Sequence, residues 1–134
     1  MTKIGIFRCK ENEQKCPLTN CFLSLQEKKQ GFAHYEEVKL YGVFTLSDKL
    51  EDNINLAKIF KSKGVEVIHF VTCSFSSKDE NSNWELGNGF FEDIDSMAQE
   101  IAENTGLACV KGTAHLPKDY VLETFKPNLL DTSQ

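Results

Sequence analysis

The chain of 134 residues has no long apolar run, no excess of positive charge and no glycine-rich phosphate-binding motif. A helix that spans a bilayer needs about 20 apolar residues, and the start Met1-Thr2-Lys3 passes directly into an apolar strand without the pattern of a signal peptide. The net charge of −5 and the lack of a basic patch argue against a nucleic-acid surface. We therefore expect a cytoplasmic protein that binds neither nucleic acid nor a membrane.

The sequence also lacks the Cys-x-x-Cys pair of redox proteins and the closely spaced cysteine pairs of zinc fingers, although it contains five cysteines. In a cytoplasmic protein these residues stay as thiols, and an odd number leaves one unpaired in any full disulfide scheme. The cysteines therefore favour a metal-ligand, redox or core role over a scaffold of disulfide bonds.

The hydrophobic pattern alternates between strands and helices along the chain. Short apolar runs predict strands, and the most apolar of them is typical of a strand covered on both faces. Apolar residues at helical spacing, followed by a glycine stop, predict the helices between them. The expected strands are 4–7, 38–45, 65–72 and 107–110, and the expected helices are 17–30, 48–63 and 90–104.

This order of elements predicts an α/β fold. We expect a three-layer sandwich, Rossmann- or flavodoxin-like, with a four-stranded parallel sheet in the order 2-1-3-4. Residues 1–115 are predicted to form one domain, and residues 116–134 a tail that packs on the surface or is partly disordered. Between the third strand and the third helix, residues 74–89 are predicted to form a long polar loop, which in a compact domain is usually functional or mobile.

The candidate site lies where the parallel strands end. Ligands of such sheets bind outside the carboxyl ends of the strands, at the switch point between strands one and three. Residues that follow these strands therefore meet at one edge, whereas Cys109 lies inside the last strand and is expected to be a core residue. The residues expected at this edge are Cys9, Cys16, Cys21, Cys73 and His115.

Two chemistries fit thiols gathered at one edge of the sheet. Thiolates with an imidazole suit Zn²⁺, and four converging thiolates would suit an iron–sulfur cluster. Of these two metal groups we favour zinc. Alternatively, Cys16 lies at the expected start of a helix, whose N-terminus lowers the pKa of a thiol, and Cys9 or Cys21 would then be its redox partner. If the cysteines only fill the core, the protein is an interaction module without metal.

Two further residues near this edge have competing interpretations. His69, inside the third strand, is expected to be a hydrogen-bonded core residue rather than a ligand. Trp84, the single tryptophan, lies in the long polar loop and would either cover the site or fold onto the surface.

The sequence around these cysteines resembles the small prokaryotic CGGC-domain proteins over about residues 3–115. The matching stretches are Ile4-Gly5-Ile6-Phe7-Arg8-Cys9, Cys16-Pro17-Leu18-Thr19-Asn20-Cys21-Phe22, Val67-Ile68-His69-Phe70-Val71-Thr72-Cys73 and Gly112-Thr113-Ala114-His115. Members of this family are expected to bind a metal because of their many cysteines and histidines. The resemblance implies a zinc-type site with Cys9, Cys16, Cys21 and Cys73 as ligands, and with His115 where the family has Gly-Thr-His.

The chain departs from this family at the motif that names it. Cys-Gly-Gly-Cys would follow the second strand, where this chain has Thr45-Leu46-Ser47-Asp48-Lys49, and a further cysteine before the third helix is replaced by Gly87-Asn88-Gly89-Phe90. Our leading hypothesis is therefore a zinc-binding protein with a reduced set of up to four thiolates. Thiol redox chemistry and a metal-free interaction module are the alternatives.

Overall fold

The computed structural model describes residues 2–81, 83–87, 89–91, 93–117 and 119–127. They form a mixed α/β fold with one large sheet in the strand order β2-β1-β3-β6-β7. The strands of this sheet are β1 (Thr2–Arg8), β2 (Val38–Thr45), β3 (Val67–Phe70), β6 (Ala108–Lys111) and β7 (Glu123–Phe125). The α-helices are α1 (Thr19–Glu27), α2 (Leu50–Ser62) and α3 (Ile94–Thr105).

The prediction is correct for the first four strands of the sheet, but it is wrong about the number of strands and about the sheet being entirely parallel. β2, β1, β3 and β6 are parallel and have the predicted relative order. A fifth strand, β7, adds to the edge and runs antiparallel to β6, so the sheet is mixed rather than parallel. This strand comes from the tail and has three residues, too few for an alternating pattern to be recognised in the sequence.

The fifth strand is attached to β6 by polar contacts of Lys111. The Lys111 ammonium lies 3.1 Å from a carboxylate oxygen of Glu123 in β7 and 2.6 Å from one of Asp95 in α3. The hydroxyl of Tyr120 also donates a 2.8 Å hydrogen bond to the Lys111 carbonyl. Part of the tail therefore belongs to the sheet, and residues 128–134 lie outside the described residues.

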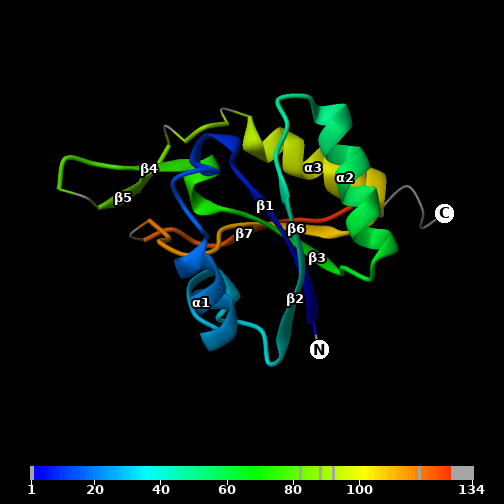
Figure 1. The fold of residues 1–134 in the computed structure, drawn as a ribbon, viewed down its shortest axis with the longest axis horizontal. Helices are drawn as coiled ribbons and strands as arrows, with labels where there is room; N and C mark the ends of the chain where they lie inside the picture. The colour runs from blue at the N-terminus through cyan, green and yellow to red at the C-terminus, as the bar shows by residue number, and fades with distance from the viewer. Residues whose placement is uncertain (1, 82, 88, 92, 118, 128–134) are drawn as a thin grey trace.

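The helices cover the sheet on both sides, as expected for a sandwich. Figure 1 shows α1 on one side of the sheet and α2 with α3 on the other. Alternation along the strands separates two apolar clusters: Ile4 and Ile6 of β1 face α1, whereas Phe7 faces the opposite side. We call these sides the α1 face and the α2/α3 face. The buried α1 face is formed by Ile4, Ile6, Cys9, Leu18, Cys21, Leu25, Phe32, Val71 and Ala114.

All three helices begin later than predicted: α2 begins at Leu50 rather than at residue 48, and the later starts of α1 and α3 affect the site. α1 begins at Thr19 rather than at Pro17, because Leu18 adopts a left-handed backbone with φ 66° that interrupts a helix. α3 begins at Ile94, so Phe90 lies outside the helix, with 47% of its surface exposed. Both shifts place polar or irregular chain at the carboxyl edge of the sheet, where the candidate site lies.

The predicted long loop after β3 contains regular structure. A short helical turn, η3 (Thr72–Ser74), leads into an antiparallel hairpin of β4 (Ser76–Lys78) and β5 (Trp84–Leu86). The hairpin projects from the body of the protein in Figure 1. Its strands have three residues each, and cross-strand pairing rather than sequence pattern defines them.

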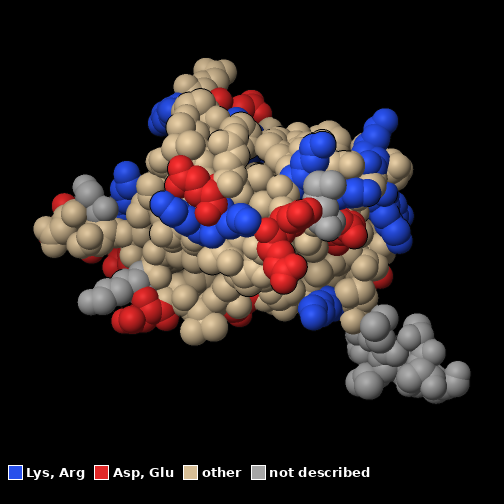
Figure 2. All heavy atoms as spheres, turned by 90° about the horizontal axis from the view of Figure 1, so that it is seen from below, with Lys and Arg blue, Asp and Glu red and all other residues tan. Residues whose placement is uncertain are grey.

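The outer surface shows no continuous region of one charge sign on the face in Figure 2, where acidic and basic side chains are interspersed. None of the helices in the described part of the chain combines the length and the apolar character that crossing a bilayer requires.

Candidate thiol site

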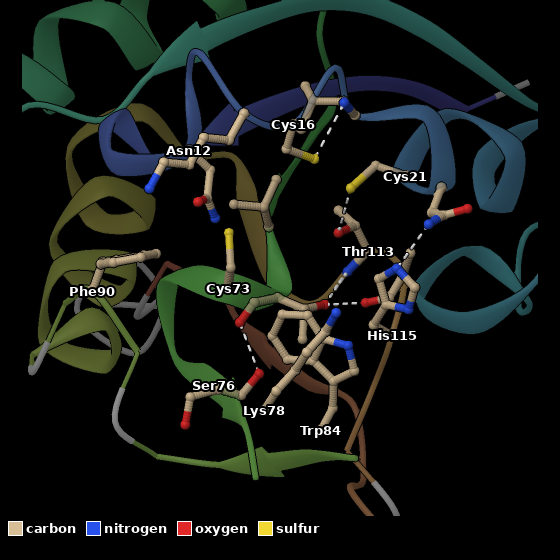
Figure 3. Close-up of a pocket in the computed structure, with 17 residues that line it drawn as sticks. Asn12, Cys16, Cys21, Cys73, Ser76, Lys78, Trp84, Phe90, Thr113 and His115 are labelled. Carbon is tan, nitrogen blue, oxygen red and sulfur yellow. Dashed lines mark hydrogen bonds between the residues drawn. The ribbon is translucent and has the colours of Figure 1, made fainter. Parts of the chain in front are cut away.

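A cavity of about 500 Å³ lies at the carboxyl edge of the sheet. Four of the five predicted site residues line it, namely Cys16, Cys21, Cys73 and His115. In Figure 3 the sulfur atoms of the three cysteines point toward the same space. The fifth residue, Cys9, is buried directly behind Cys73, with only 1% of its surface exposed. The topology therefore brings all five residues to the carboxyl edge of the sheet, four of them at the cavity and Cys9 against Cys73.

Cys9 and Cys73 form the closest contact of the site. Cys9 follows β1 and Cys73 lies in η3 after β3, and the pairing of Phe7 with Phe70 brings these two strand ends side by side. Their sulfur atoms are 2.7 Å apart, and either one can be the hydrogen-bond donor. All five cysteines are free thiols. The pair is thus in direct thiol contact, at a separation longer than the ~2.05 Å of a disulfide bond.

This contact shifts the pKa values of the two thiols in opposite directions. The hydrogen bond from Cys73, aided by hydrogen bonding from Asn12, lowers the pKa of Cys9 to about 7 against the opposing effect of burial. The same contact and burial raise the pKa of Cys73, because its proton is held between the sulfurs. The pair therefore loses its first proton near neutral pH and retains the second, which gives one thiolate shared by two sulfurs.

The other two cysteines of the cavity have different surroundings. The sulfur of Cys21 lies 3.1 Å from the hydroxyl oxygen of Thr113, and burial raises the pKa of its thiol. The sulfur of Cys16 accepts a 3.4 Å hydrogen bond from the backbone N–H of Leu18. Cys16 was predicted to occupy the start of the helix, but Leu18 holds that position, two residues later. The sulfur in contact with Cys9 is that of Cys73, a pairing that the redox hypothesis had not considered.

The loop between Cys9 and Cys16 is held by Arg8. One terminal nitrogen of its guanidinium donates to the carbonyls of Asn12 and Cys16, at 3.0 and 2.8 Å. These bonds tie the loop to the end of β1 and place Asn12 beside the thiol pair. Asn12 was not predicted as a site residue, because a single polar residue in a charged loop carries no motif.

The ends of β3 and β6 are joined behind the cavity by a threonine. The hydroxyl of Thr72 donates to the carbonyl of Ala114 at 2.5 Å and accepts from the N–H of Thr113 at 3.2 Å. Thr72 is 3% exposed, so these bonds satisfy a buried hydroxyl. They fix the position of Cys73, the next residue, relative to the loop that carries His115.

His115 and Trp84 form the outer wall of the cavity. Their rings stack with 5.5 Å between centroids and 12° between planes, and the side-chain amide of Asn20 donates to His115 Nε2 at 2.9 Å. The Lys78 ammonium lies 5.7 Å from the Trp84 ring centroid. Burial and the charge of Lys78 lower the pKa of His115. Of the two interpretations of Trp84, the structure supports the one in which it covers the site.

Two residues expected to belong to the core are confirmed there. His69 is fully buried: its Nδ1 lies 2.8 Å from the Gly112 carbonyl, to which it donates, and its Nε2 accepts from the Tyr35 hydroxyl at 2.7 Å. Burial lowers the pKa of His69 to about 3, so its imidazole is neutral. Cys109 is also fully buried, and burial raises the pKa of its thiol to about 12.

The donor atoms do not form a closed zinc site in this arrangement. No group of three or more cysteine, histidine or acidic residues that could hold a metal ion occurs among the described residues. Two thiolates bound at ~2.3 Å to a tetrahedral zinc ion would lie about 3.8 Å apart, farther than the 2.7 Å between Cys9 and Cys73. The pair therefore fits direct thiol chemistry better than shared coordination.

The turn after β2 adjoins this site. The hydroxyl of Thr45, at the end of β2, donates a 2.7 Å hydrogen bond to the carboxylate of Glu13 in the Cys9–Cys16 loop. In this sequence the turn supplies a hydroxyl and no thiol, so the region where Cys-Gly-Gly-Cys was expected contributes no thiolate ligand.

Comparison with known proteins agrees with the resemblance seen in the sequence. No curated protein and no solved structure gave a match to the chain. The family model of the CGGC domain matches residues 3–114, which include four of the five cysteine and histidine positions of the site. That range also covers the three α-helices and the four parallel strands, except for the first residue of β1. The chain therefore belongs to the CGGC-domain family.

Proposed function

We propose that this protein is a thiol redox protein in which Cys9 and Cys73 alternate between a dithiol and a disulfide. The observation that carries this proposal is the 2.7 Å contact between the two sulfurs. The lowered pKa of Cys9 supports it, because a Cys9 thiolate can accept the proton of Cys73, and only a deprotonated sulfur attacks a disulfide. A reducing cytoplasm would return the pair to the dithiol form, so we place the protein there.

Cys73 is the sulfur that meets a substrate, because it lines the cavity whereas Cys9 is buried behind it. The Cys9 thiolate takes the proton of Cys73 across their contact, and the sulfur of Cys73 attacks one sulfur of a substrate disulfide, forms a mixed disulfide and releases one substrate thiolate. The sulfur of Cys9 then attacks Cys73, forms the Cys9–Cys73 disulfide and releases the second substrate thiolate. Two electrons pass to the substrate, the remaining proton of the pair leaves with a product thiol, and an external thiol reductant restores the pair.

Oxidation with a small disulfide tests this function. After treatment with hydroxyethyl disulfide we expect the intact protein to lose two hydrogen atoms in mass and a proteolytic digest to contain a Cys9–Cys73 linked peptide. Cys73→Ser should abolish the Cys9–Cys73 disulfide. The matched control Cys109→Ser removes a thiol on the opposite face of the sheet and should leave this disulfide intact. A disulfide between other cysteines, or none at all, would contradict the proposal.

Zinc binding is the second candidate. It is favoured by the family, whose cysteines and histidines suggest a metal, and by the common cavity of Cys16, Cys21, Cys73 and His115. With Cys9 these are the proposed ligands, and to hold an ion the sulfurs of Cys9 and Cys73 would have to separate while the other ligands converge on them. An iron–sulfur cluster would need the same movement.

Metal analysis of protein purified without an affinity tag decides between the two candidates. Zinc binding predicts about one equivalent of zinc and protected thiols, because structural zinc sites bind tightly. The redox function predicts less than about a tenth of an equivalent and freely titratable Cys9 and Cys73. Thiols that are neither metal-bound nor reactive would favour the third alternative, an interaction module whose cysteines only fill the core.

A further inference from the structure

The cavity in front of Cys73 has an unusual charge composition for this protein. The whole chain carries 20 acidic and 15 basic residues. The described residues that line the cavity include Lys15, Lys78 and His115 but no aspartate or glutamate. An acidic protein therefore presents its candidate nucleophile in a cavity whose charged groups are all basic.

The two lysines of this cavity are not neutralised by the protein. Within the described parts of the chain, neither Lys15 nor Lys78 forms an ion pair, whereas Lys111 pairs with two carboxylates elsewhere. Lys78 contacts the face of Trp84 instead, and Figure 3 shows both beside His115 at the cavity. Their ammonium groups are therefore available to a bound anion.

The acidic residues of the loop that carries Lys15 do not line the cavity. Glu13 accepts a hydrogen bond from the hydroxyl of Thr45. Glu11 opposes ionisation of Cys9 but does not line the cavity. The first turn of α1 contributes Asn20 and Cys21 to the wall, and the N-terminal end of a helix also favours negative charge.

The remaining wall suits a small organic molecule. Its volume of about 500 Å³ lies in the range of ordinary small-molecule sites. The Trp84 ring supplies an apolar surface, and Asn12, Asn20 and Ser77 supply polar groups. A folded protein would have to extend a segment into this space to reach Cys73.

We propose that the substrate of the Cys9–Cys73 pair is a small anionic disulfide, one that carries carboxylates held by Lys15 and Lys78 while its sulfur meets Cys73. This inference rests on the proposed redox function and adds to it the chemical class of the substrate. The overall reaction is the one written above, with two electrons passing to the anionic disulfide and two anionic thiols released.

Three small disulfides of opposite or no charge test the proposal: dithiodiglycolate is anionic, hydroxyethyl disulfide neutral and cystamine cationic. The rate at which each disulfide reacts with the protein is divided by the rate at which the same disulfide reacts with a free monothiol. This ratio corrects for the intrinsic reactivity of the disulfide. At low salt we expect the anionic disulfide to react about tenfold faster than the cationic one, and this preference to shrink as salt screens the charges.

Lysine variants assign the preference to the cavity. Lys15→Gln and Lys78→Gln should each reduce the anionic preference several-fold, and the double variant should remove it. The control Lys58→Gln, on the exposed side of α2, should retain it. Equal corrected rates for the three disulfides, or a preference that survives in the double lysine variant, would overturn the substrate assignment and leave the redox function standing. Failure of all three to react would overturn the redox function itself.

A binding measurement keeps the substrate assignment testable without reaction. In a variant with Cys9→Ser and Cys73→Ser, dithiodiglycolate should change the fluorescence of Trp84, the single tryptophan of the chain. Cystamine at the same concentration should not. An equal response to both compounds would contradict an anion-selective cavity, whatever the outcome of the redox assays.

Discussion

The two faces of the central sheet differ in what fills them. The α2/α3 face is a continuous apolar cluster in which Phe60 packs against Phe7 at 5.4 Å and Phe44 at 4.7 Å between ring centroids. The α1 face contains four of the five cysteines and the buried imidazole of His69. The same strands supply both faces, since alternate residues point to opposite sides.

This difference assigns folding stability and thiol chemistry to opposite faces of the sheet. Close apolar packing on the α2/α3 face leaves its cysteine, Cys109, without solvent or a thiol partner. On the α1 face, the buried imidazole of His69 and the buried hydroxyl of Thr72 are hydrogen-bonded, and the cavity opens beside them. We expect the first face to dominate folding stability and the second to carry thiol reactivity.

The largest expected contrast is between the cysteines of the two faces. In the folded protein near neutral pH, iodoacetamide should modify Cys73 more than about a thousandfold faster than Cys109, because the pair ionises near pH 7 whereas the pKa of Cys109 is raised to about 12 and the residue is fully buried. Peptide mapping after timed labelling measures both rates. In denaturant the two rates should converge, and similar rates in the folded state would break the comparison.

Removing an aromatic ring from the α2/α3 face should have the next largest effect. Phe60→Ala should lower the free energy of unfolding by about 3–5 kcal/mol, because Phe60 is 3% exposed and its loss leaves a cavity. Urea denaturation measures this change, and Ile59→Ala, at a position 44% exposed on the same helix, should change it by less than about 0.5 kcal/mol. If Phe60→Ala changed the rate at which iodoacetamide labels Cys73 in the folded protein, the packing of one face would affect the reactivity of the other, and the comparison would fail.

Acidification should destabilise the protein through the α1 face. The pKa of His69 falls from its ordinary 6.5 to about 3 on folding, so the unfolded chain binds a proton that the folded protein excludes. This contribution is absent above pH 6.5 and lowers the free energy of unfolding as pH falls toward 3, by up to about 1.4 kcal/mol per pH unit.

Urea denaturation across this pH range measures the slope, and carboxylates contribute to it as well. His69→Gln should therefore reduce the slope relative to the unaltered protein, and it should do so more than His34→Gln, because the exposed His34 only adds a charge that helps to lower the pKa of His69. An unchanged slope in His69→Gln would show that His69 is not the titrating group.

The smallest expected effect concerns one hydrogen bond on the α1 face. Tyr35→Phe removes the donor to Nε2 of His69 and leaves a buried acceptor unpaired, which should cost about 1–3 kcal/mol. Tyr41→Phe, at a residue 41% exposed, is the matched control and should have little effect. Equal costs for the two variants would mean that the buried hydrogen bond adds no stability.

Much of the site could be predicted from the sequence because parallel strands end at one edge. That rule brings Cys9, Cys73 and His115 together from positions far apart in the chain. In agreement with it, Cys73 and His115 line one cavity and Cys9 contacts Cys73. The rule places residues only at the edge, and it does not specify which side chains touch. The pairing of Cys9 with Cys73 depends on the register of β1 and β3 and on the turn at Thr72, so sequence spacing did not predict it.

The sequence by itself determined the α/β class, the relative order of the four parallel strands, and the core positions of His69 and Cys109, because apolar periodicity and strand ends are local properties. It also indicated the family, through the resemblance of four stretches around the cysteines and His115. Only the tertiary structure decided the start of α1 beyond Leu18, the β4–β5 hairpin, the fifth strand and the thiol pair. Each of these depends on short segments or single contacts between distant residues, whose free energy comes from the assembled fold and leaves no pattern along the chain.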